Sequence, residues 1–304
     1  MSSSIDLGPP ALPFSRQFIK SLRVSQPQPP ENLNLTGQTG IITGGNSGIG
    51  FEASMTLLGY KLSHLIITTR DSRKGEDAVA KLKALHPTAL IEAWPLDMLS
   101  YDSIRTFTQR CASLGRIDFA ILNAATQHGE FVINESTKHE LVFQVNYLST
   151  VLLTLLLLLV LKEKRSQRKP GRVTIVSPGL AMTAKFPEQR ADKIIPAFDD
   201  PSGWGWPAAA ERYSTTKLLL LMFVIKLKDH VDPNEVVVNA ADPGFMRGTG
   251  LDRGIPAYMK ATYGLMRMVM GRGLKAGAWA YVDAAVVKPD ATHGSWMYNW
   301  EVYS

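Results

Sequence analysis

Short apolar runs alternate with longer helical patterns along this chain from residue 36 onward. Helical segments of this length can connect parallel strands and cover both faces of their sheet. The pattern predicts an α/β fold, a doubly wound parallel sheet of about seven strands with right-handed crossovers and helices on both faces. Strands are expected at residues 40–43, 65–69, 90–94, 117–123, 172–177 and 236–241. Helices are expected to begin near Gly48, Arg73, Tyr101, Glu135 and Ala208, with two more at residues 255–270 and 274–287.

Composition narrows the class of protein. Of 304 residues, 45% are hydrophobic and 20% are charged, which is typical of a soluble globular protein. The single cysteine, Cys111, excludes an intramolecular disulfide and favours a reducing compartment, so we expect a cytoplasmic location. The net charge of +6 does not come from one basic stripe. The densest basic run, at residues 162–172, follows an apolar helix whose C-terminus cations stabilise, so no nucleic-acid partner is expected.

Residues 1–35 form an N-terminal extension rich in Ser, Pro and Gln, without the apolar segment of a secretory signal. Within it, Phe14, Phe18 and Leu22 recur at a helical spacing and predict one short amphipathic helix. We expect it to dock on its own domain, with a membrane surface as the alternative. The longest apolar run, residues 151–161, is too short to span a bilayer. It predicts a buried helix and no stable membrane insertion.

A glycine-rich turn lies between the first predicted strand and the first helix of the alternating pattern. It reads Thr43-Gly44-Gly45-Asn46-Ser47-Gly48-Ile49-Gly50. Glycines at such a junction permit a tight turn and a close backbone approach, and the helix N-terminus offers unpaired N–H groups to a pyrophosphate. An isolated glycine cluster is more often a plain turn, but its place at the first strand-to-helix junction favours a dinucleotide site.

Tyr213 and Lys217 stand four residues apart in a predicted helix. Residues at this spacing share one helix face, so the two side chains can converge on one point. A free phenol titrates near pH ~10, and a fixed ammonium beside it lowers that pKa towards a useful range. The spacing alone is common on solvated helix faces, and the glycine turn upstream is what gives it weight.

With these motifs the chain resembles the short-chain dehydrogenase/reductase (SDR) family. Residues 43–50 match its TGxxxGxG turn at each fixed position, and Tyr213 with Lys217 matches its YxxxK pair. Further matches follow in the family's order at Asp97, Asn123-Ala124, Asn146 and Pro243-Gly244. The resemblance covers residues 36–250 and is nearest to fungal secondary-metabolite members of the retinol-dehydrogenase-like branch. It implies one Rossmann-type domain over residues 36–304.

The resemblance also implies roles for individual residues. Tyr213 would act as the acid/base, Lys217 would lower its pKa and bond the nicotinamide ribose, and Asn146 would hold a water in a proton relay. Thr249 stands one residue beyond the family's usual threonine after Pro-Gly, where this chain has Gly248. The residues expected to hold the cofactor are Thr43, Gly44, Asn46, Ser47, Gly48, Ile49, Gly50, Arg70, Asp97, Asn123, Ala124, Tyr213, Lys217, Pro243, Gly244 and Thr249. No metal is expected.

Arg70 ends the second predicted strand and bears on the choice of cofactor. An acidic residue there would bond a ribose 2′-hydroxyl, whereas an arginine can pair with a 2′-phosphate. Arg73 and Lys74 add positive charge, although Asp71 is adjacent. The expected cofactor is NADP(H) rather than NAD(H).

The chain departs from the family at the end of the fifth strand, where the family has a serine that hydrogen-bonds the substrate oxygen. Here Pro178 takes that position and has no side-chain donor. Ser177 is a doubtful substitute, since successive strand side chains point to opposite faces. Thr183 is a second, weaker candidate. Losing one such donor costs other enzymes about 10²–10³ in rate.

The substrate side is expected to be built from an insertion at residues 178–212 and a C-terminal segment at residues 250–304. Long loops are often functional, and Trp204 and Trp206 could stack on a bulky substrate or pack internally. Met259, Met266, Met268 and Met270 suit either an adaptable pocket or helix packing.

Three functions remain open from the sequence. The leading one is an NADP(H)-dependent ketone reductase or alcohol dehydrogenase that acts on a bulky small molecule and uses Tyr213 as its acid/base. Pro178 motivates the second, a non-redox dehydration, isomerisation or cyclisation on the same fold. The third, a non-catalytic nucleotide-binding scaffold, is disfavoured because Tyr213, Lys217 and Asn146 are all present. Family members commonly form homodimers or homotetramers through helices equivalent to residues 101–114, 135–161 and 208–228.

Overall fold

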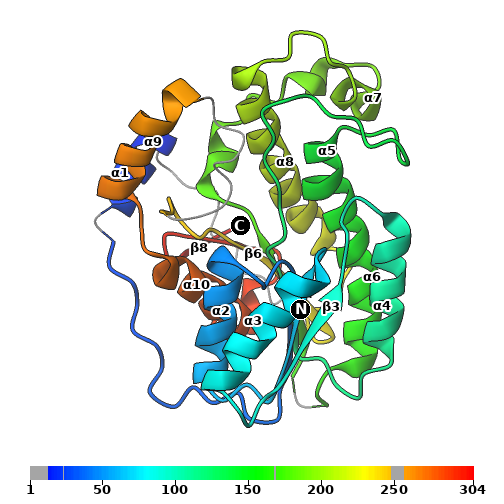
Figure 1. Ribbon diagram of the computed structural model, residues 1–304, viewed down its shortest axis with the longest axis vertical. Helices are drawn as coiled ribbons and strands as arrows, with labels where there is room; N and C mark the ends of the chain where they lie inside the picture. Colours follow the sequence, from blue (N-terminus) through cyan, green and yellow to red (C-terminus); the bar gives the residue numbers. More distant parts are fainter. Residues whose placement is uncertain (1–12, 23, 168, 248–256) are drawn as a thin grey trace.

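The computed structural model describes residues 13–22, 24–167, 169–247 and 257–304, and its centre is one eight-stranded sheet (Figure 1). The strand order is β3-β2-β1-β4-β5-β6-β7-β8, with every neighbouring pair parallel except β7 and β8. The strands are β1 Thr39–Ile42, β2 His64–Thr69, β3 Leu90–Pro95, β4 Phe119–Leu122, β5 Gly171–Val176, β6 Val236–Ala241, β7 Trp296–Tyr298 and β8 Glu301–Tyr303. The doubly wound fold predicted from the sequence is therefore confirmed.

The sheet has eight strands where about seven parallel ones were expected, and the difference lies in an antiparallel hairpin at the C-terminal end of the sheet. β7 and β8 have three residues each and pair antiparallel. Asn299 and Trp300 connect them with φ values of 51° and 71°. Two consecutive residues with positive φ form the turn that suits a two-residue hairpin. Tryptophan rarely takes this conformation, so no turn could be predicted there from the residue types.

Helices cover both faces of the sheet, and successive strand residues point alternately into two cores. Ile41 and Ile66 belong to the core on one face, whereas Ile42 and Ile67 belong to the core on the other. The first core is closed by α4 (Tyr101–Ala112), α6 (Ser149–Lys164) and α8 (Trp206–Leu227). The second is closed by α2 (Gly48–Gly59), α3 (Ser72–Leu85) and α10 (Leu274–Val282). This two-sided burial explains why the strands read as continuous apolar runs.

The helix expected near Glu135 begins six positions later, at Leu141, and this start is a correction to the sequence prediction. Asn134 accepts hydrogen bonds from the backbone and hydroxyl of Ser136, which turns the chain before any helix can form. Glu140 then caps the helix, because its carboxylate accepts from the amides of Val142 and Phe143. The segment continues as α5 (Leu141–Phe143), the π-turn η1 (Gln144–Leu148) and α6.

The apolar run at residues 151–161 lies in α6. Of the described residues, one helical stretch, Leu141–Lys164, is long and apolar enough to cross a membrane by length and composition alone. In its most apolar window 61% is buried inside the protein. Leu153, Leu157 and Leu161, spaced four apart, are completely buried against the sheet. A core helix has this pattern, as the sequence led us to expect.

The insertion at residues 178–212 folds on α5 and α8. It contains η2 (Gly179–Thr183), η3 (Pro187–Arg190) and α7 (Ile194–Phe198). The rings of Phe143 and Phe198 stack with centroids 4.0 Å apart. Arg212, at 4% exposure, donates to fully buried Glu140 at 3.0 Å and to the Phe198 carbonyl at 2.6 Å. This ion pair joins the helix that carries Asn146 to the helix that carries Tyr213.

The remaining described elements complete the two ends of the chain. α1 spans Phe14–Ser21, in agreement with the predicted amphipathic helix, and it docks on its own domain. The two helical patterns predicted near the C-terminus are α9 (Ala257–Met270) and α10, which continues into the π-turn η5 (Asp283–Val287). The 3₁₀ turn η6 (Asp290–Thr292) leads into β7.

Candidate active site

A cavity of about 1400 Å³ lies at the carboxyl ends of the parallel strands. β1 and β4 are neighbours there although the chain runs from β1 to β2, so strand order reverses at this point. Ligands bind at such a switch point in open α/β sheets. The predicted site residues that line the cavity are Gly44, Asn46, Ser47, Gly48, Ile49, Arg70, Asp97, Asn123, Ala124, Tyr213, Lys217, Pro243 and Gly244. Thr43, Gly50, Asn146 and Ser177 lie behind this lining, and Thr249 lies outside the described residues.

The glycine turn is shaped to admit a phosphate group. Gly44 and Gly48 have φ values of +65° and +57°, which side-chain-bearing residues rarely adopt. Ser47 precedes α2 without a side-chain capping bond, so the first amides of the helix face the cavity without that partner. A Cβ on Gly50 would lie 2.6 Å from the Gly44 carbonyl. These residues fit a dinucleotide pyrophosphate at the helix N-terminus.

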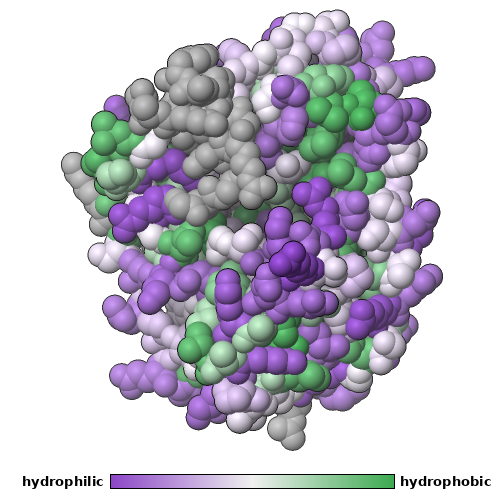
Figure 2. All heavy atoms as spheres, viewed as in Figure 1, coloured by the Kyte–Doolittle hydropathy of each residue, from purple (hydrophilic) through white to green (hydrophobic). Residues whose placement is uncertain are grey.

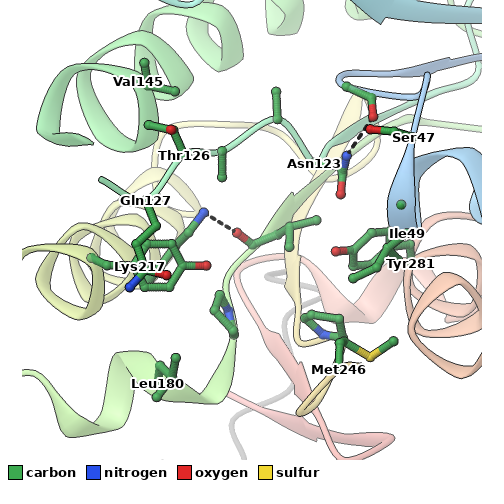
Figure 3. A pocket seen from close by; sticks show the side chains of 18 of the residues that line it. Ser47, Ile49, Asn123, Thr126, Gln127, Val145, Leu180, Lys217, Met246 and Tyr281 are labelled. Carbon is green, nitrogen blue, oxygen red and sulfur yellow. Dashed lines mark hydrogen bonds between the residues drawn. The ribbon is translucent and has the colours of Figure 1, made fainter. Parts of the chain in front are cut away.

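Hydrogen bonds between the ends of β1 and β4 hold the turn open. The side-chain amide of Asn123 donates to the backbone carbonyls of Thr43 at 2.9 Å and Gly44 at 3.3 Å. The Thr43 hydroxyl accepts from the backbone amide of Ala124 at 2.9 Å. Thr43 thus supports the cavity from behind, while Asn123 also faces it (Figure 3).

Basic groups lie where β2 ends. Arg70 and Lys74 line the cavity, whereas Arg73 does not. Asp71 also lines it, but its carboxylate caps α3 by accepting from the Lys74 amide at 3.2 Å. This bond lowers the pKa of Asp71. A carboxylate held at its own helix terminus is less available for a ribose hydroxyl, and the adjacent cations favour a phosphate.

Tyr213 and Lys217 project from α8 into the same cavity and are 6% and 2% exposed. The Lys217 Nζ lies 5.8 Å from the Tyr213 ring centroid and donates to the Val176 carbonyl at 3.2 Å. Figure 3 shows the Lys217 side chain reaching the end of β5. Burial lowers the pKa of Lys217 to about 7. A buried lysine titrating near neutrality in a cavity is typical of a functional group.

Asn146 lies in the π-turn η1 and is fully buried. Its Oδ1 accepts from the Thr126 amide at 2.8 Å, and its Nδ2 donates to the Thr126 carbonyl at 2.9 Å. Thr126 itself lines the cavity. Single π-turns within helices frequently occur at functional sites, and this one places Asn146 behind the cavity wall rather than in it.

Ser177 faces away from the cavity, and Pro178 lines it. The Ser177 hydroxyl is fully buried and donates to the Lys217 carbonyl at 2.8 Å. Thr183 does line the cavity, with its hydroxyl bonded to the Leu180 carbonyl at 2.7 Å and 3.4 Å from the hydroxyl oxygen of Ser214. Among the described residues after Pro178, the serine and threonine hydroxyls that line the cavity are those of Thr183 and Ser214.

The substrate-side expectations are met in part. Trp206 lines the cavity, but Trp204 packs on Phe131 and donates to the Gly129 carbonyl at 3.0 Å. Met266 and Met268 are 37% and 68% exposed on α9, and apolar surface is visible at the left edge of Figure 2 where α9 lies. These two residues do not line the cavity and are exposed, so neither of the two expected roles, adaptable pocket or helix packing, describes them. The side chain of Met259 is not among those that the structure describes.

Sequence reasoning missed several cavity residues, namely Asp242, Ser214, Tyr281 and Tyr298. Asp242 directly precedes Pro243-Gly244, and this adjacency could have identified it. Its Oδ1 accepts from the Gly179 amide at 3.0 Å, while its Oδ2 is buried without a hydrogen-bond partner among the described residues. Burial raises the pKa of Asp242 to about 6. The tyrosines come from α10 and β7, and nothing in their sequence surroundings marked them.

The raised pKa of Asp242 predicts a loss of stability as pH rises. An unfolded aspartate titrates near pH ~4, so between that pH and about 6 the folded protein binds the extra proton. The free energy of unfolding should then fall with increasing pH across this window. Asp242→Asn removes the titrating carboxyl. The free energy of unfolding of this variant minus that of the wild type should therefore increase by about 3 kcal/mol from pH 4 to pH 8. Urea unfolding across that pH range measures it.

Asp102→Asn is the matched control, because the Asp102 side chain is 90% exposed. The change in its stability relative to wild type over the same pH range should be smaller than that of Asp242→Asn, because an exposed ion pair such as Asp102–Arg105 contributes little to stability. A constant difference for Asp242→Asn would show that the buried carboxyl does not titrate as described.

Comparisons with known proteins agree with this geometry. A family model described as short chain dehydrogenase matches residues 38–190. The short chain dehydrogenase/reductase mfmJ of Annulohypoxylon moriforme is 44% identical over 306 residues, covering 100% of this chain and 88% of the relative. The short chain dehydrogenase virL of Hypocrea virens is 37% identical over 282 residues, covering 91% of this chain and 81% of the relative.

Solved structures share the fold at low sequence identity. The RhlG/NADP active-site complex of Pseudomonas aeruginosa has a TM-score of 0.61 and 22% identity, covering 83% of this chain and 91% of that one. Salutaridine reductase of Papaver somniferum has a TM-score of 0.60 and 20% identity, covering 83% and 96%. The family-model match over half of the sequence and the relative at 44% identity show that this chain belongs to the short-chain dehydrogenase/reductase family.

Proposed function

We propose that this protein is an NADP(H)-dependent oxidoreductase that interconverts a ketone and an alcohol on a bulky small molecule. One observation carries the proposal: Tyr213 and Lys217 face the same cavity as the glycine turn. A proton donor therefore lies beside a site that fits a dinucleotide. The family membership and a neighbour solved as an NADP complex support this choice of chemistry.

In this proposal the first amides of α2 would hold the pyrophosphate, and Arg70 and Lys74 would hold the 2′-phosphate. When bound, the dinucleotide supplies or accepts the hydride equivalent. Tyr213 gives its hydroxyl proton to the carbonyl oxygen during reduction and takes it back during oxidation. The Lys217 ammonium favours the phenolate that reduction leaves behind. Asn146 fixes the Thr126 backbone at the cavity wall.

The Thr183 and Ser214 hydroxyls are the proposed replacement for the missing serine. Both line the cavity, and Ser214 follows Tyr213 directly on α8. The Thr183 hydroxyl donates to the Leu180 carbonyl at 2.7 Å, and its contact with Ser214 is weak at 3.4 Å, so the Ser214 hydroxyl can turn towards a substrate oxygen at little cost. The cavity of about 1400 Å³ exceeds the roughly 300–1,000 Å³ of single-ligand pockets, so it has room for a substrate beside the dinucleotide. A secondary metabolite is the class we propose.

Tyr213→Phe should lower kcat for ketone reduction by at least about 100-fold, because proton transfer contributes about 10²–10⁴ in such reactions. The dissociation constant for NADPH should change little, since the ring and Lys217 remain. NADPH consumption with a panel of bicyclic ketones, beside a fluorescence titration of NADPH, measures both quantities. Tyr60→Phe is the control, because Tyr60 packs on Trp279 outside the cavity. An unchanged kcat in Tyr213→Phe would reject the acid/base role.

Pro178 supports a second candidate function, a dehydration, isomerisation or cyclisation in the same cavity. Pro178→Ser separates the two candidates. If the protein is a reductase, the added hydroxyl should leave turnover equal or raise it, by at most about 10²–10³. If the reaction is not a redox one, substrate should be converted without net NADPH consumption in wild type and variant alike.

Arg70→Leu tests the choice of NADP(H). Loss of a charge-assisted bond to the 2′-phosphate should raise KM for NADPH about 10- to 100-fold and leave KM for NADH nearly unchanged. Arg73→Leu is the control. It removes the same charge three residues further along the chain, but the Arg73 side chain does not line the cavity, so this substitution should change KM for NADPH less than about twofold. Equal effects of the two substitutions would mean that general charge, and not a specific contact, attracts the cofactor.

A homodimer or homotetramer is part of the proposal. Leu155 and Leu159 on α6 are 44% and 66% exposed, and Met222 and Ile225 on α8 are 47% and 43% exposed. Both helices cover the same face of the sheet. Sedimentation at micromolar concentration should show a dimer or tetramer, and Leu159→Arg should shift it to smaller species. A monomeric wild type would contradict this assembly.

A further inference from the structure

The N-terminal helix α1 forms part of the cavity wall. Phe14, Phe18 and Ser21 line the same cavity as Tyr213 and Lys217. The family-model match begins at residue 38, so α1 lies outside the matched region. Figure 1 shows the chain running from α1 along the outer edge of the molecule back to β1. This wall is therefore an addition to the part of the fold that the family model describes.

Polar contacts fix α1 to the C-terminal part of the chain. The Arg272 guanidinium donates to the Ser21 carbonyl at 2.8 Å, and Lys20 pairs with Glu301 at 2.8 Å. Gln17 and Ser21 are buried, at 3% and 6% exposure. The helix is thus held through backbone and polar groups at several points and has a defined position.

The aromatic face of α1 is left incompletely covered. The Phe18 ring meets Phe245 edge-on at 5.5 Å, and Phe14 stacks on Phe18 at 6.0 Å. Both phenylalanines are only half-buried and border the cavity. An amphipathic helix normally docks by burying its apolar stripe. Here polar residues are buried instead, and the aromatic rings remain as apolar surface that a ligand can cover.

The position of these rings assigns them to the substrate half of the cavity. α1 packs against η2, which directly follows Pro178 and carries Thr183. Phe245 follows Pro243-Gly244 at the end of β6. The glycine turn and Arg70, in contrast, belong to β1 and β2, on the other side of β4 in the strand order. Phe14 and Phe18 are therefore grouped with the elements at the Tyr213 end of the cavity and not with the glycine turn and Arg70.

We propose that α1 is the outer wall of the substrate site, and that Phe14 and Phe18 select substrates with a flat aromatic or polycyclic ring system. Aromatic rings prefer offset-stacked or edge-on partners at centroid distances of about 4.5–7 Å, and half-exposed rings at a cavity border offer such partners. The proposal rests on the proposed function for the reacting end of the substrate. It concerns the distal end, whose binding is measurable without turnover.

The test is the binding of 2-naphthol, a flat bicyclic alcohol, to the protein saturated with NADP⁺. Phe18→Ala and Phe14→Ala should each weaken binding about tenfold, and Phe18→Leu should weaken it less, because some apolar contact is kept. Ile19→Ala is the matched control on the same helix, since Ile19 is 52% exposed and does not line the cavity. It should bind 2-naphthol within about twofold of wild type. Isothermal titration gives the dissociation constants, and NADP⁺ affinity should be unchanged throughout.

Three results would overturn the inference. The wild type could fail to bind 2-naphthol, or both phenylalanine variants could bind it as tightly as the wild type. The third result is that Ile19→Ala weakens binding as much as Phe18→Ala does. The proposed function fails separately. If the protein binds 2-naphthol through α1 but reduces no ketone, the oxidoreductase function is rejected and the role of α1 as a substrate wall is kept. If the enzyme reduces ketones but the phenylalanine variants bind 2-naphthol with unchanged dissociation constants, the wall is rejected and the oxidoreductase function is kept.

Discussion

Two hydrogen bonds between Lys217 and the end of β5 determine where the reactive groups lie. The Ser177 hydroxyl donates to the Lys217 carbonyl at 2.8 Å, and the Lys217 ammonium donates to the Val176 carbonyl at 3.2 Å. They fix α8 against the strand end, so that Tyr213 faces the cavity. The buried pair of Arg212 and Glu140 holds the start of the same helix. Ser177 therefore has a structural role that keeps its hydroxyl away from a substrate.

The same strand end explains how the site can lack the usual serine and still keep the rest of its machinery. Pro178 takes the position that faces the cavity, and Gly179 is tied to Asp242. The glycine turn, the acid/base candidate and the basic residues at β2 do not depend on that side chain. The loss is confined to one donor, for which we propose Thr183 and Ser214 as the replacement.

Much of this fold could be predicted from the sequence because its signals are local. Buried parallel strands read as apolar runs, and the glycine turn stands at a strand end. The hairpin of β7 and β8 could not be predicted, because Asn299 and Trp300 adopt positive φ without a glycine. Tyr281 and Tyr298 were missed because tertiary packing alone brings them to the cavity. The spacing of Phe14 and Phe18 predicted a helix, but not that its rings would border the cavity.

The central claim is that this cavity performs hydride chemistry between a dinucleotide and a carbonyl. Incubating the protein with a bicyclic ketone such as 2-tetralone and NADPH deuterated at both positions of its reactive carbon tests it directly. The account predicts an alcohol with one deuterium on the carbinol carbon and one NADP⁺ formed for each alcohol. Conversion of the ketone to a product without deuterium, or without NADPH consumption, would contradict it.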